Sequence, residues 1–495
     1  MTLRPCVPCL PIAVVSLLAL APLADAQTIP SFTTTNSGSG GAERLTYGVD
    51  AGLGETDNVS LAPVVRVSQT IATVDADFDI KHQSSRLDVD AKGNFTDLDY
   101  LQGAYGNQLL GRFDGAAHFA LVPQRLTWVL QDDFGQAALD PFVPTTPGNL
   151  EDVNYVSTGP DFAMRMGGTG FVDASLRVAR ATYQTSPFNS SRVLGSVAAG
   201  LQLSARSSVS LNGVAERVLF DNTVVNGDFN RSSAYARYEI QGARTLLSAD
   251  LGATKITQNA SAGTSTVVIS PNGSSITEPI TVPQAAYSTT GPLARISLNR
   301  RLSSAASLNV LAGRELTDGI SSFGSIQPGA IGVVGAVPAL LTSSSYTSDF
   351  GSVAWRYERN RTVIDVSGHW EKDVYISQPQ FDLTRGGGEL KVERQLSRAF
   401  ALQVLGRYYK TDYPKATVLT LAGGSPKLDD GIVAAILSWR HGRALEVRLR
   451  AEHSSRTTPG IDQGYRETRG LLTVGYRPRS QQSNDSSIDS LDTER

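Results

Sequence analysis

Residues 74–81 read Val-Asp-Ala-Asp-Phe-Asp-Ile-Lys, with apolar side chains at the even positions and charged side chains at the odd ones. A period of two predicts a β-strand with two unlike faces. The same alternation returns in residues 87–95 and, near the C-terminus, in residues 445–452. A half-buried strand explains an alternating pattern, but it does not by itself explain a second face that is charged at nearly every step.

The connections between such stretches alternate between short and long. About twenty candidate strands can be placed. The short connections are Gln83-Ser84-Ser85, Val122-Pro123-Gln124, Gly167-Gly168-Thr169, Gly242-Ala243, Arg359-Asn360 and His441-Gly442, and the long ones are 136–152, 221–230, 258–287, 315–345, 412–428 and 456–464. Transmembrane β-barrels have tight periplasmic turns, longer extracellular loops and an even number of strands. Counted from Arg44, every short turn follows an even-numbered strand, which would leave both chain ends in the periplasm.

The predicted fold is therefore all-β: a transmembrane antiparallel up-and-down β-barrel of about 20 strands, within a range of 18–22. In hydrocarbon every backbone N–H and C=O needs a partner within the protein, so a sheet can cross the membrane only when it has no free edge. Aromatic residues near strand ends are predicted to form girdles at the membrane interfaces. They are Tyr100, Tyr155, Tyr183, Phe220, Tyr346, Tyr357, Tyr375, Tyr408 and Tyr476.

Composition excludes several other classes. The chain has 495 residues, 41% hydrophobic residues and a formal net charge of −3, so it lacks the basic surplus of a dedicated nucleic-acid binder. Beyond the N-terminus no apolar run approaches the length that a membrane-spanning helix needs. A soluble β-propeller or β-solenoid is the alternative fold, but no blade motif recurs.

The chain divides into four predicted segments. Residues 1–26 have the features of a secretory signal peptide, with an apolar core over 12–23 and a small-x-small cleavage site at Ala24-Asp25-Ala26. Both cysteines lie inside this segment, so the mature chain would contain none. Residues 27–43 are predicted to be a flexible periplasmic segment, 44–477 the barrel and 478–495 a disordered polar tail. The expected location is the outer membrane of a Gram-negative bacterium.

No catalytic constellation stands out. The histidines are scattered, with His82 and His441 expected in turns, and motifs for nucleophile elbows, phosphate-binding loops and zinc are absent. The loop that carries Asp221, Asn222, Asn226, Asp228 and Asn230 offers oxygen ligands for Ca²⁺, but its spacing does not match an EF-hand, and a polar turn is the preferred interpretation. We expect no enzyme activity, no cofactor and no metal, although an enzyme assembled from distant strands stays open.

Charged side chains on the proposed inner face are the candidate functional residues. They are Arg177, Arg237, Glu239, Lys391, Glu393, Arg448 and Arg450, together with an Asp-rich set near Asp77 and Asp88. In the functional interpretation they line a polar conduit that admits a hydrated, often anionic glycan. In the structural interpretation neighbouring charges pair across strands and stiffen the wall. The lumen is expected to be wide, and it would be narrowed if 258–287 or 315–345 folded inward.

Two groups of motifs resemble an outer-membrane barrel family that accompanies exopolysaccharide biosynthesis and export systems. One is Thr56-Asp57-Asn58-Val59; the other comprises residues 128–135, Asp140-Pro141, Pro147-Gly148-Asn149, Asn154-Tyr155 and Ser157-Thr158-Gly159-Pro160. The resemblance implies a barrel tied to exopolysaccharide production or export. The polar tail from Ser480 to Arg495 departs from the many barrels that end on an aromatic residue.

The predicted function is an outer-membrane channel in an exopolysaccharide secretion or surface-assembly system. Its expected partners are outer-membrane lipid, the barrel-assembly machinery, an anionic polysaccharide and periplasmic export components, with no nucleic acid, and the chain is expected to be a monomer. The alternative is a structural or adhesive surface barrel that has a closed lumen and binds glycans or cells through its loops.

Overall fold

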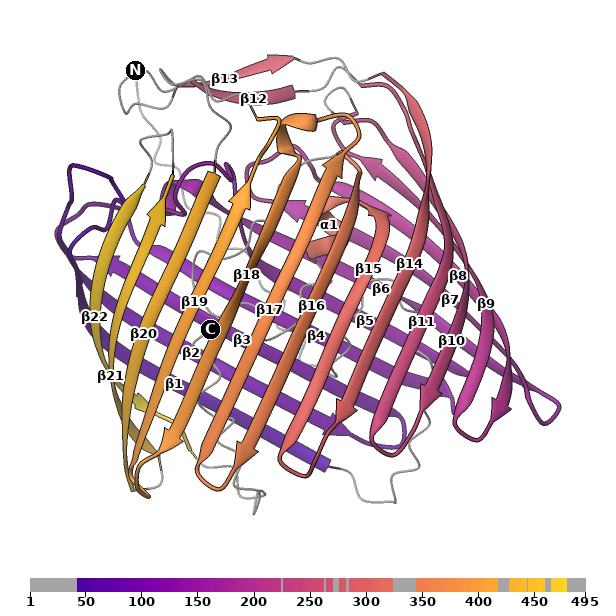
Figure 1. Cartoon of the computed structure of the whole chain (residues 1–495), viewed down its shortest axis with the longest axis horizontal. Coiled ribbons are helices and arrows are strands. Elements are labelled where there is room, and N and C mark those ends of the chain that lie inside the picture. Colours follow the sequence, from indigo (N-terminus) through magenta and orange to yellow (C-terminus); the bar gives the residue numbers. More distant parts are fainter. Residues whose placement is uncertain are drawn as a thin grey trace, which may run out of the picture.

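The computed structural model describes residues 42–223, 226–261, 264–269, 276–281, 285–323, 344–416, 427–442, 444–458 and 464–478. These residues form one 20-stranded antiparallel sheet and a separate two-stranded hairpin (Figure 1). The sheet consists of β1 (Ala42–Thr56), β2 (Gln69–Gln83), β3 (Leu87–Tyr100), β4 (Gln108–Val122), β5 (Leu126–Ala138), β6 (Leu150–Met166), β7 (Gly170–Tyr183), β8 (Ser190–Ser204), β9 (Ser207–Phe220), β10 (Phe229–Gln241), β11 (Thr245–Gln258), β14 (Tyr287–Arg301), β15 (Ala306–Thr317), β16 (Tyr346–Arg359), β17 (Thr362–Tyr375), β18 (Leu383–Gln395), β19 (Phe400–Asp412), β20 (Lys427–His441), β21 (Leu445–Thr457) and β22 (Tyr465–Tyr476).

Smaller elements lie in the connections. They are the hairpin of β12 (Thr264–Ile269) and β13 (Ile276–Thr281), the helix α1 (Gly319–Phe323) and the 3-10 turns η1 (Pro147–Asn149) and η2 (Pro379–Phe381). Among the described residues, no helix is both long and apolar enough to cross a membrane. The predicted signal peptide, residues 27–41 and the tail from 479 onward lie outside the described residues, and β1 begins at Ala42, two residues before Arg44.

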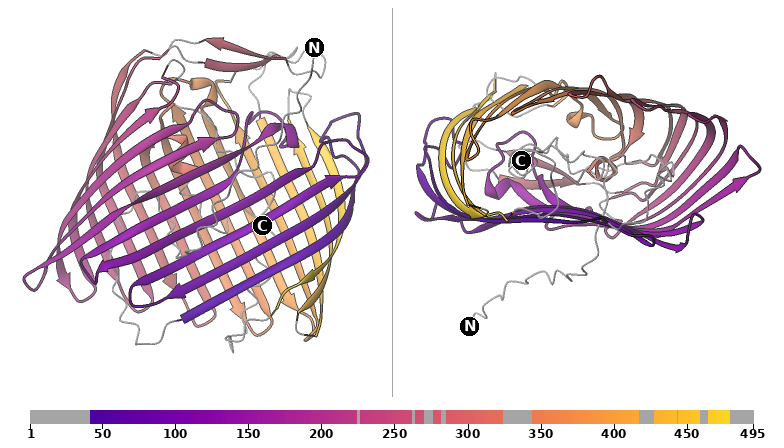
Figure 2. Two further views of the ribbon diagram at one scale, coloured as in Figure 1. Left: turned by 180° about the vertical axis from the view of Figure 1, so that it is seen from behind. Right: turned by 90° about the horizontal axis from the view of Figure 1, so that it is seen from below.

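Each strand pairs with its neighbours in the chain, and β1 also pairs with β22 from Val49↔Tyr476 to Thr56↔Arg469. This pairing closes the sheet into a barrel, so the strands leave no free edge. Figure 2 shows that the barrel is flattened, with β1–β7 in one broad wall and β16–β20 in the opposite one. The prediction of a closed, all-β antiparallel barrel of about 20 strands is confirmed.

The two faces of each strand differ as the alternation predicts. Val74 and Leu449 are more than half exposed, whereas Asp77 and Arg448 on the opposite faces of the same strands are buried. Large apolar side chains are exposed on nearly every strand, and polar or charged ones are buried between them. An isolated soluble sheet would bury its apolar face instead. The exposed apolar surface is therefore the surface that meets lipid.

Connections of two lengths gather at the two ends of the barrel. The short connections are 84–86, 123–125, 167–169, 205–206, 242–244, 302–305, 360–361, 396–399 and 442–444. They lie at the lower end in Figure 1, which we call the short-turn end. The connections at the opposite end, called the long-loop end, include 57–68, 139–149, 259–286, 318–345 and 413–426. The hairpin of β12 and β13 lies beyond this end (Figure 1).

The Thr56-Asp57-Asn58 motif stabilises the long-loop end of the junction between β1 and β22, where the barrel closes. Asn58 is fully buried, and its Nδ2 donates to the carbonyl oxygens of Ala62 (2.9 Å) and Arg466 (3.0 Å). Thr56 Oγ1 donates to Glu467 Oε1 at 2.6 Å, and the Asp57 carboxylate accepts from the backbone N–H of Thr468 at 2.7 Å. The motif thus ties the first hairpin loop to the last strand, which explains its sequence on structural grounds.

The aromatic prediction is wrong for six of the nine residues. Tyr100, Phe220, Tyr346 and Tyr375 are buried, and Tyr155 and Tyr183 pack against a buried cluster inside the barrel. These six rings stand near the long-loop ends of their strands but point inward. The outward face holds Tyr357, Tyr408 and Tyr476, of which the last two are more than half exposed. Tyr155 and Tyr183 pack against the cluster that includes α1, and Tyr346 and Tyr375 pack against η2, whereas Phe220 packs against wall residues of β10, β11 and β15.

Candidate functional site

The inner face of the wall is identified by α1, which lies inside the barrel (Figure 2). The residues at its start contact Arg192 of β8 and Arg231 of β10, so these side chains point into the lumen. Cross-strand partners share a face of the sheet. The strand registers therefore carry this assignment from β10 around the whole barrel.

The structure places the candidate residues on this inner face, in separate pairs. Arg237 binds Asp250 through two hydrogen bonds of 2.7 and 2.9 Å and lies 3.8 Å from Glu239. The other printed pairs are Arg177 Nη2 with Asp161 Oδ1 at 2.6 Å, Arg448 Nη2 with Asp50 Oδ2 at 2.6 Å, and Arg450 Nη2 with Glu452 Oε2 at 2.5 Å. Lys391 and Glu393 are both buried on neighbouring inward positions of β18, and Lys391 is the register partner of Asp365.

The Asp-rich set divides in the same way. Asp77 Oδ1 lies 2.6 Å from Arg477 Nη2, and the same guanidinium lies 2.5 Å from Asp50 Oδ2. Because Asp50 also binds Arg448, this group joins β1, β2 and β21 near the short-turn end. Asp88 pairs in register with His118. The candidates are thus spread around the barrel, mostly as neutralised pairs of the kind that holds adjacent strands together.

Arg177 also contacts the sequence motif that carries the family resemblance. Its Nη1 donates to the carbonyl oxygen of Pro160 at 3.2 Å. Beside it, a Cβ atom on Gly159 would lie 1.9 Å from the carbonyl oxygen of Leu176. Only glycine allows this close approach of the backbones of β6 and β7. The Gly159-Pro160 dipeptide therefore has a local structural cause.

The loop 139–149 crosses the lumen from β5 and β6 to the opposite wall. The Phe142 ring contacts Tyr413 (centroids 4.8 Å apart) and Phe381 of η2 (6.3 Å), and the Val143 carbonyl accepts from Arg456 Nη1 at 3.1 Å. Inside the loop, Asn149 Nδ2 donates to the carbonyl oxygens of Asp140 and Pro144, and Asn149 Oδ1 accepts from the Asp140 N–H. The hydrogen bonds between Asp140 and Asn149, one residue from each of the two motifs, thus set the shape of the loop that places Phe142.

A second segment enters the lumen from the other side. After β15 ends at Thr317, Asp318 and α1 turn inward, and Ile320 packs in a buried cluster with Ala137, Val153 and Ala181 of β5, β6 and β7. Inward folding of 258–287 or 315–345 is the condition given above for a narrower lumen, and the described start of 315–345 does turn inward. What the alternation could not show is that its anchor is charged.

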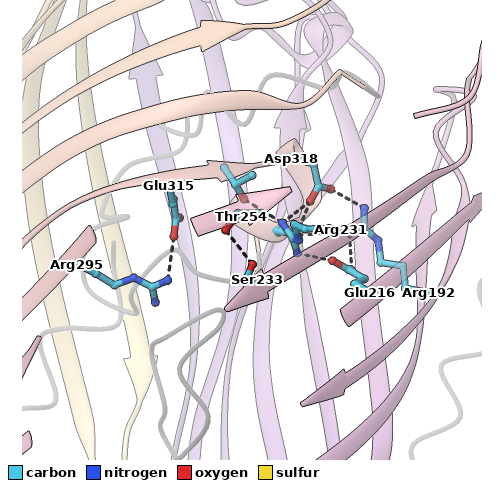
Figure 3. A network of polar contacts seen from close by, with 10 residues as sticks. Arg192, Glu216, Arg231, Ser233, Thr254, Arg295, Glu315 and Asp318 are labelled. Carbon is cyan, nitrogen blue, oxygen red and sulfur yellow. Dashed lines mark hydrogen bonds and ion pairs between the residues drawn. The ribbon is translucent and has the colours of Figure 1, made fainter. Parts of the chain in front are cut away.

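Figure 3 shows this anchor. Asp318 Oδ2 lies 2.7 Å from Arg192 Nη2, and Asp318 Oδ1 lies 3.2 Å from Arg231 Nη1. Glu216 of β9 pairs with both arginines as well, at 3.2 Å from Arg192. All four side chains are at least 95% buried. Burial alone would raise the pKa of Asp318, but the guanidinium groups of Arg192 and Arg231 outweigh it and hold that pKa well below its usual range.

The loop considered for Ca²⁺ is not assembled as a metal site. Asp221 pairs with Arg180, Asp228 Oδ1 accepts from the Phe220 N–H, and Asn226 Nδ2 donates to the Pro187 carbonyl. Within the described part of the chain, no group of three or more His, Cys, Asp or Glu side chains could hold a metal ion. His82 and His441, expected in turns, belong to the ends of β2 and β20.

Sequence reasoning missed Arg192, Glu216, Arg231, Asp318 and Phe142. The first three stand at inward positions near the long-loop ends of their strands, so the alternation that selected Arg237 could have included them. Asp318 and Phe142 follow strand ends in irregular segments, where periodicity carries no information. Only the partners across the lumen show what these two residues do.

Comparison with models of protein families finds no match, and comparison with curated proteins finds none either. Solved barrels are loosely similar. The FrpB iron transporter from Neisseria meningitidis (F5-1 variant) is 9% identical with a TM-score of 0.44, over 88% of this chain and 82% of that one. The copper transporter OprC is 12% identical with a TM-score of 0.40, over 88% and 81%. The ferric-catecholate import receptor Fiu from E. coli K12 (closed form) is 10% identical with a TM-score of 0.41, over 88% and 82%. At these values nothing about their cargo is carried over to this chain.

The location follows from the architecture of this chain itself. Its backbone hydrogen bonds close on themselves, its outer surface is apolar and its inner surface is charged. A closed antiparallel barrel of this kind is the form in which proteins span bacterial outer membranes. The chain is an outer-membrane β-barrel.

Proposed function

We propose that this barrel is a passage for hydrated polar solutes and that it serves exopolysaccharide secretion or surface assembly. The single observation that supports the passage is the polar, charged inner face beneath an apolar outer face, which is the arrangement of outer-membrane barrels with a polar interior. The exopolysaccharide part of the proposal rests on the resemblance that the Thr56-Asp57-Asn58 motif and the motifs of residues 128–160 carry. In this proposal the short-turn end faces the periplasm and the long-loop end faces outward.

Planar-bilayer recordings test the passage. We expect step currents from the purified barrel, and larger ones when residues 258–287 or 315–345 are replaced by short Gly/Ser linkers. An absence of current from all three folded proteins would contradict it. Deletion of the gene, with complementation, tests the process: we expect loss of surface polysaccharide and recovery with the intact chain.

The alternative function is a surface barrel with a closed lumen that binds glycans or cells through its long loops. It is favoured by the two segments that bridge opposite walls, because such bridges also suit a permanently closed cylinder. Loop deletions that abolish surface binding, in cells that still secrete polysaccharide, would favour this alternative.

A further inference from the structure

The contact of Asp318 with the wall of β8–β10 has the geometry of a bound ligand. Each oxygen of its carboxylate faces a different guanidinium group, at 2.7 Å for Arg192 and 3.2 Å for Arg231. Arginine is well suited to such recognition, because its charge is permanent and its donors lie in a fixed planar fork. Ser321 Oγ adds a hydrogen bond to Asp318 Oδ1 at 2.5 Å from the same segment.

The wall would keep this site if the segment moved away. Glu216 stands between the two arginines in the barrel order and pairs with both of them, so it holds their side chains in place. Without Asp318 the wall would present two guanidinium groups against one carboxylate. Such a buried excess of positive charge is costly unless an anion neutralises it.

A buried aromatic ring and two buried hydroxyl groups surround the arginine pair. The Arg192 guanidinium lies 6.0 Å from the centre of the Phe229 ring, and on neighbouring strands Ser233 Oγ and Thr254 Oγ1 form a hydrogen-bonded pair at 2.8 Å (Figure 3). Phe229 and Thr254 are each only 1% exposed, so these groups pack around the arginine pair, and the two guanidinium groups are what would recognise the carboxylate of a sugar.

We propose that Arg192 and Arg231 form a binding site for carboxylate-bearing sugar residues, and that Asp318 occupies this site as an internal ligand. A uronate that replaces Asp318 conserves the ion pairs and frees α1 from the wall of β8–β10. The inference deepens the proposed function and rests on it for two points: that a sugar carries the carboxylate, and that the lumen widens when Asp318 is displaced. Binding itself does not require conduction.

Calorimetry of the detergent-solubilised barrel with trigalacturonate tests the site, with neutral maltotriose as the matched probe. Asp318 competes at the high effective concentration of a tethered group, so we expect the Asp318→Ala barrel to bind trigalacturonate about tenfold or more tightly than the wild type. Adding Arg192→Gln to Asp318→Ala should abolish that gain, and maltotriose should not bind measurably to any of these proteins. Asp221→Asn, which alters an ion pair outside this cluster, should leave binding unchanged.

The proposal would be overturned if the wild type and a folded Asp318→Ala barrel bound trigalacturonate equally well. It would also be overturned if adding Arg192→Gln to Asp318→Ala left the affinity unchanged. If Asp318→Ala does not fold, Asp318→Asn provides the same comparison, because it removes the charge and keeps the shape. If trigalacturonate binds as expected but the barrel carries no current in bilayers, the passage is refuted and the binding site stands. Current with unchanged binding would refute the site alone.

Discussion

The two segments that enter the lumen are held to the barrel wall by different forces. Loop 139–149 is held by the partly buried Phe142 ring and by a backbone carbonyl, and its own shape is fixed by hydrogen bonds to Asn149. The segment 318–321 is held by one carboxylate between two arginines. The first contact depends on shape, which no solute can replace. The second depends on charge balance, which another anion can supply, so we infer that the first is a fixed brace and the second a releasable one.

The largest effect is expected from Asp318→Ala. It leaves two buried arginines with one carboxylate, and breaking a buried pair in this way costs about 3–5 kcal/mol of unfolding free energy. Denaturant unfolding of the barrel in detergent measures the loss. A stability within error of the wild type would show that the ion cluster does not anchor the segment.

Phe142→Ala should remove the aromatic contact of loop 139–149. Because the ring is only partly buried, we expect a loss of roughly 2–3 kcal/mol, below the range for fully buried phenylalanine. Trigalacturonate binding should stay at the wild-type value, since the ion cluster is untouched. A change in that binding would mean that the two segments are coupled.

Asn149→Ala should loosen the same loop from within. It removes the donor to the Asp140 carbonyl (2.8 Å) and one of the two donors to the Pro144 carbonyl, which keeps the Thr146 N–H at 2.9 Å, at a cost of about 1–3 kcal/mol. Limited proteolysis should then cut the loop faster than in the wild type. Asp221→Asn serves as the control, with unchanged cleavage of 139–149.

Lowering the pH should stabilise the fold through Asp140 of loop 139–149 and destabilise it through Asp318. Burial raises the pKa of Asp140 above its usual 3.8, so its charge destabilises the fold at neutral pH and protonation relieves that cost as pH falls toward 3.8. The pKa of Asp318 is lowered by Arg192 and Arg231, so its stabilisation is complete above 3.8 and is lost as pH falls toward about 2. Thermal unfolding of Asp140→Asn and Asp318→Asn against the wild type should show the two pH windows. Loss of the Asp318 contribution already between pH 7 and 5 would contradict this.

The smallest effect is expected for the exposed pair of Arg180 and Asp221. Both side chains are about half exposed, so Asp221→Asn should change the unfolding free energy by less than about 1 kcal/mol, and by less still in high salt. The same denaturant assay measures it. A loss as large as that of Asp318→Ala would mean that burial does not set the difference between the pairs.

Much of the fold could be predicted from the alternation. Residues 74–81 identify a strand with a wet face and an apolar face, and short turns at places such as Asn360 and Gly442 divide the chain into nearly all of its strands. The aromatic rings show where this reasoning ends. Tyr346 and Tyr375 stand near strand ends as expected, but an aromatic residue has a favourable place both at a membrane interface and against a segment inside the barrel. Periodicity alone does not distinguish these two positions.

The candidate site was predictable only in kind. Inward charges such as Arg237 and Arg448 follow from the period of two, whereas their partners depend on closure, which brings Asp50 beside a strand almost 400 residues away. No sequence pattern marked Asp318, because its role comes from its contact with an arginine pair on β8 and β10. The motifs near Asn58 and Asn149 can be recognised in the sequence. Only the structure shows that Asn58 joins the first loop to β22 and that Asn149 sets the shape of loop 139–149.

The central claim is that a polar lumen exists and that the Asp318 contact restricts it. Single-channel conductance of the wild type and of Asp318→Ala, in the same planar bilayers, tests this most directly. The account predicts step currents from both proteins, with a larger conductance or longer open times in the variant. Silence from both folded barrels, or identical currents from the two, would contradict it.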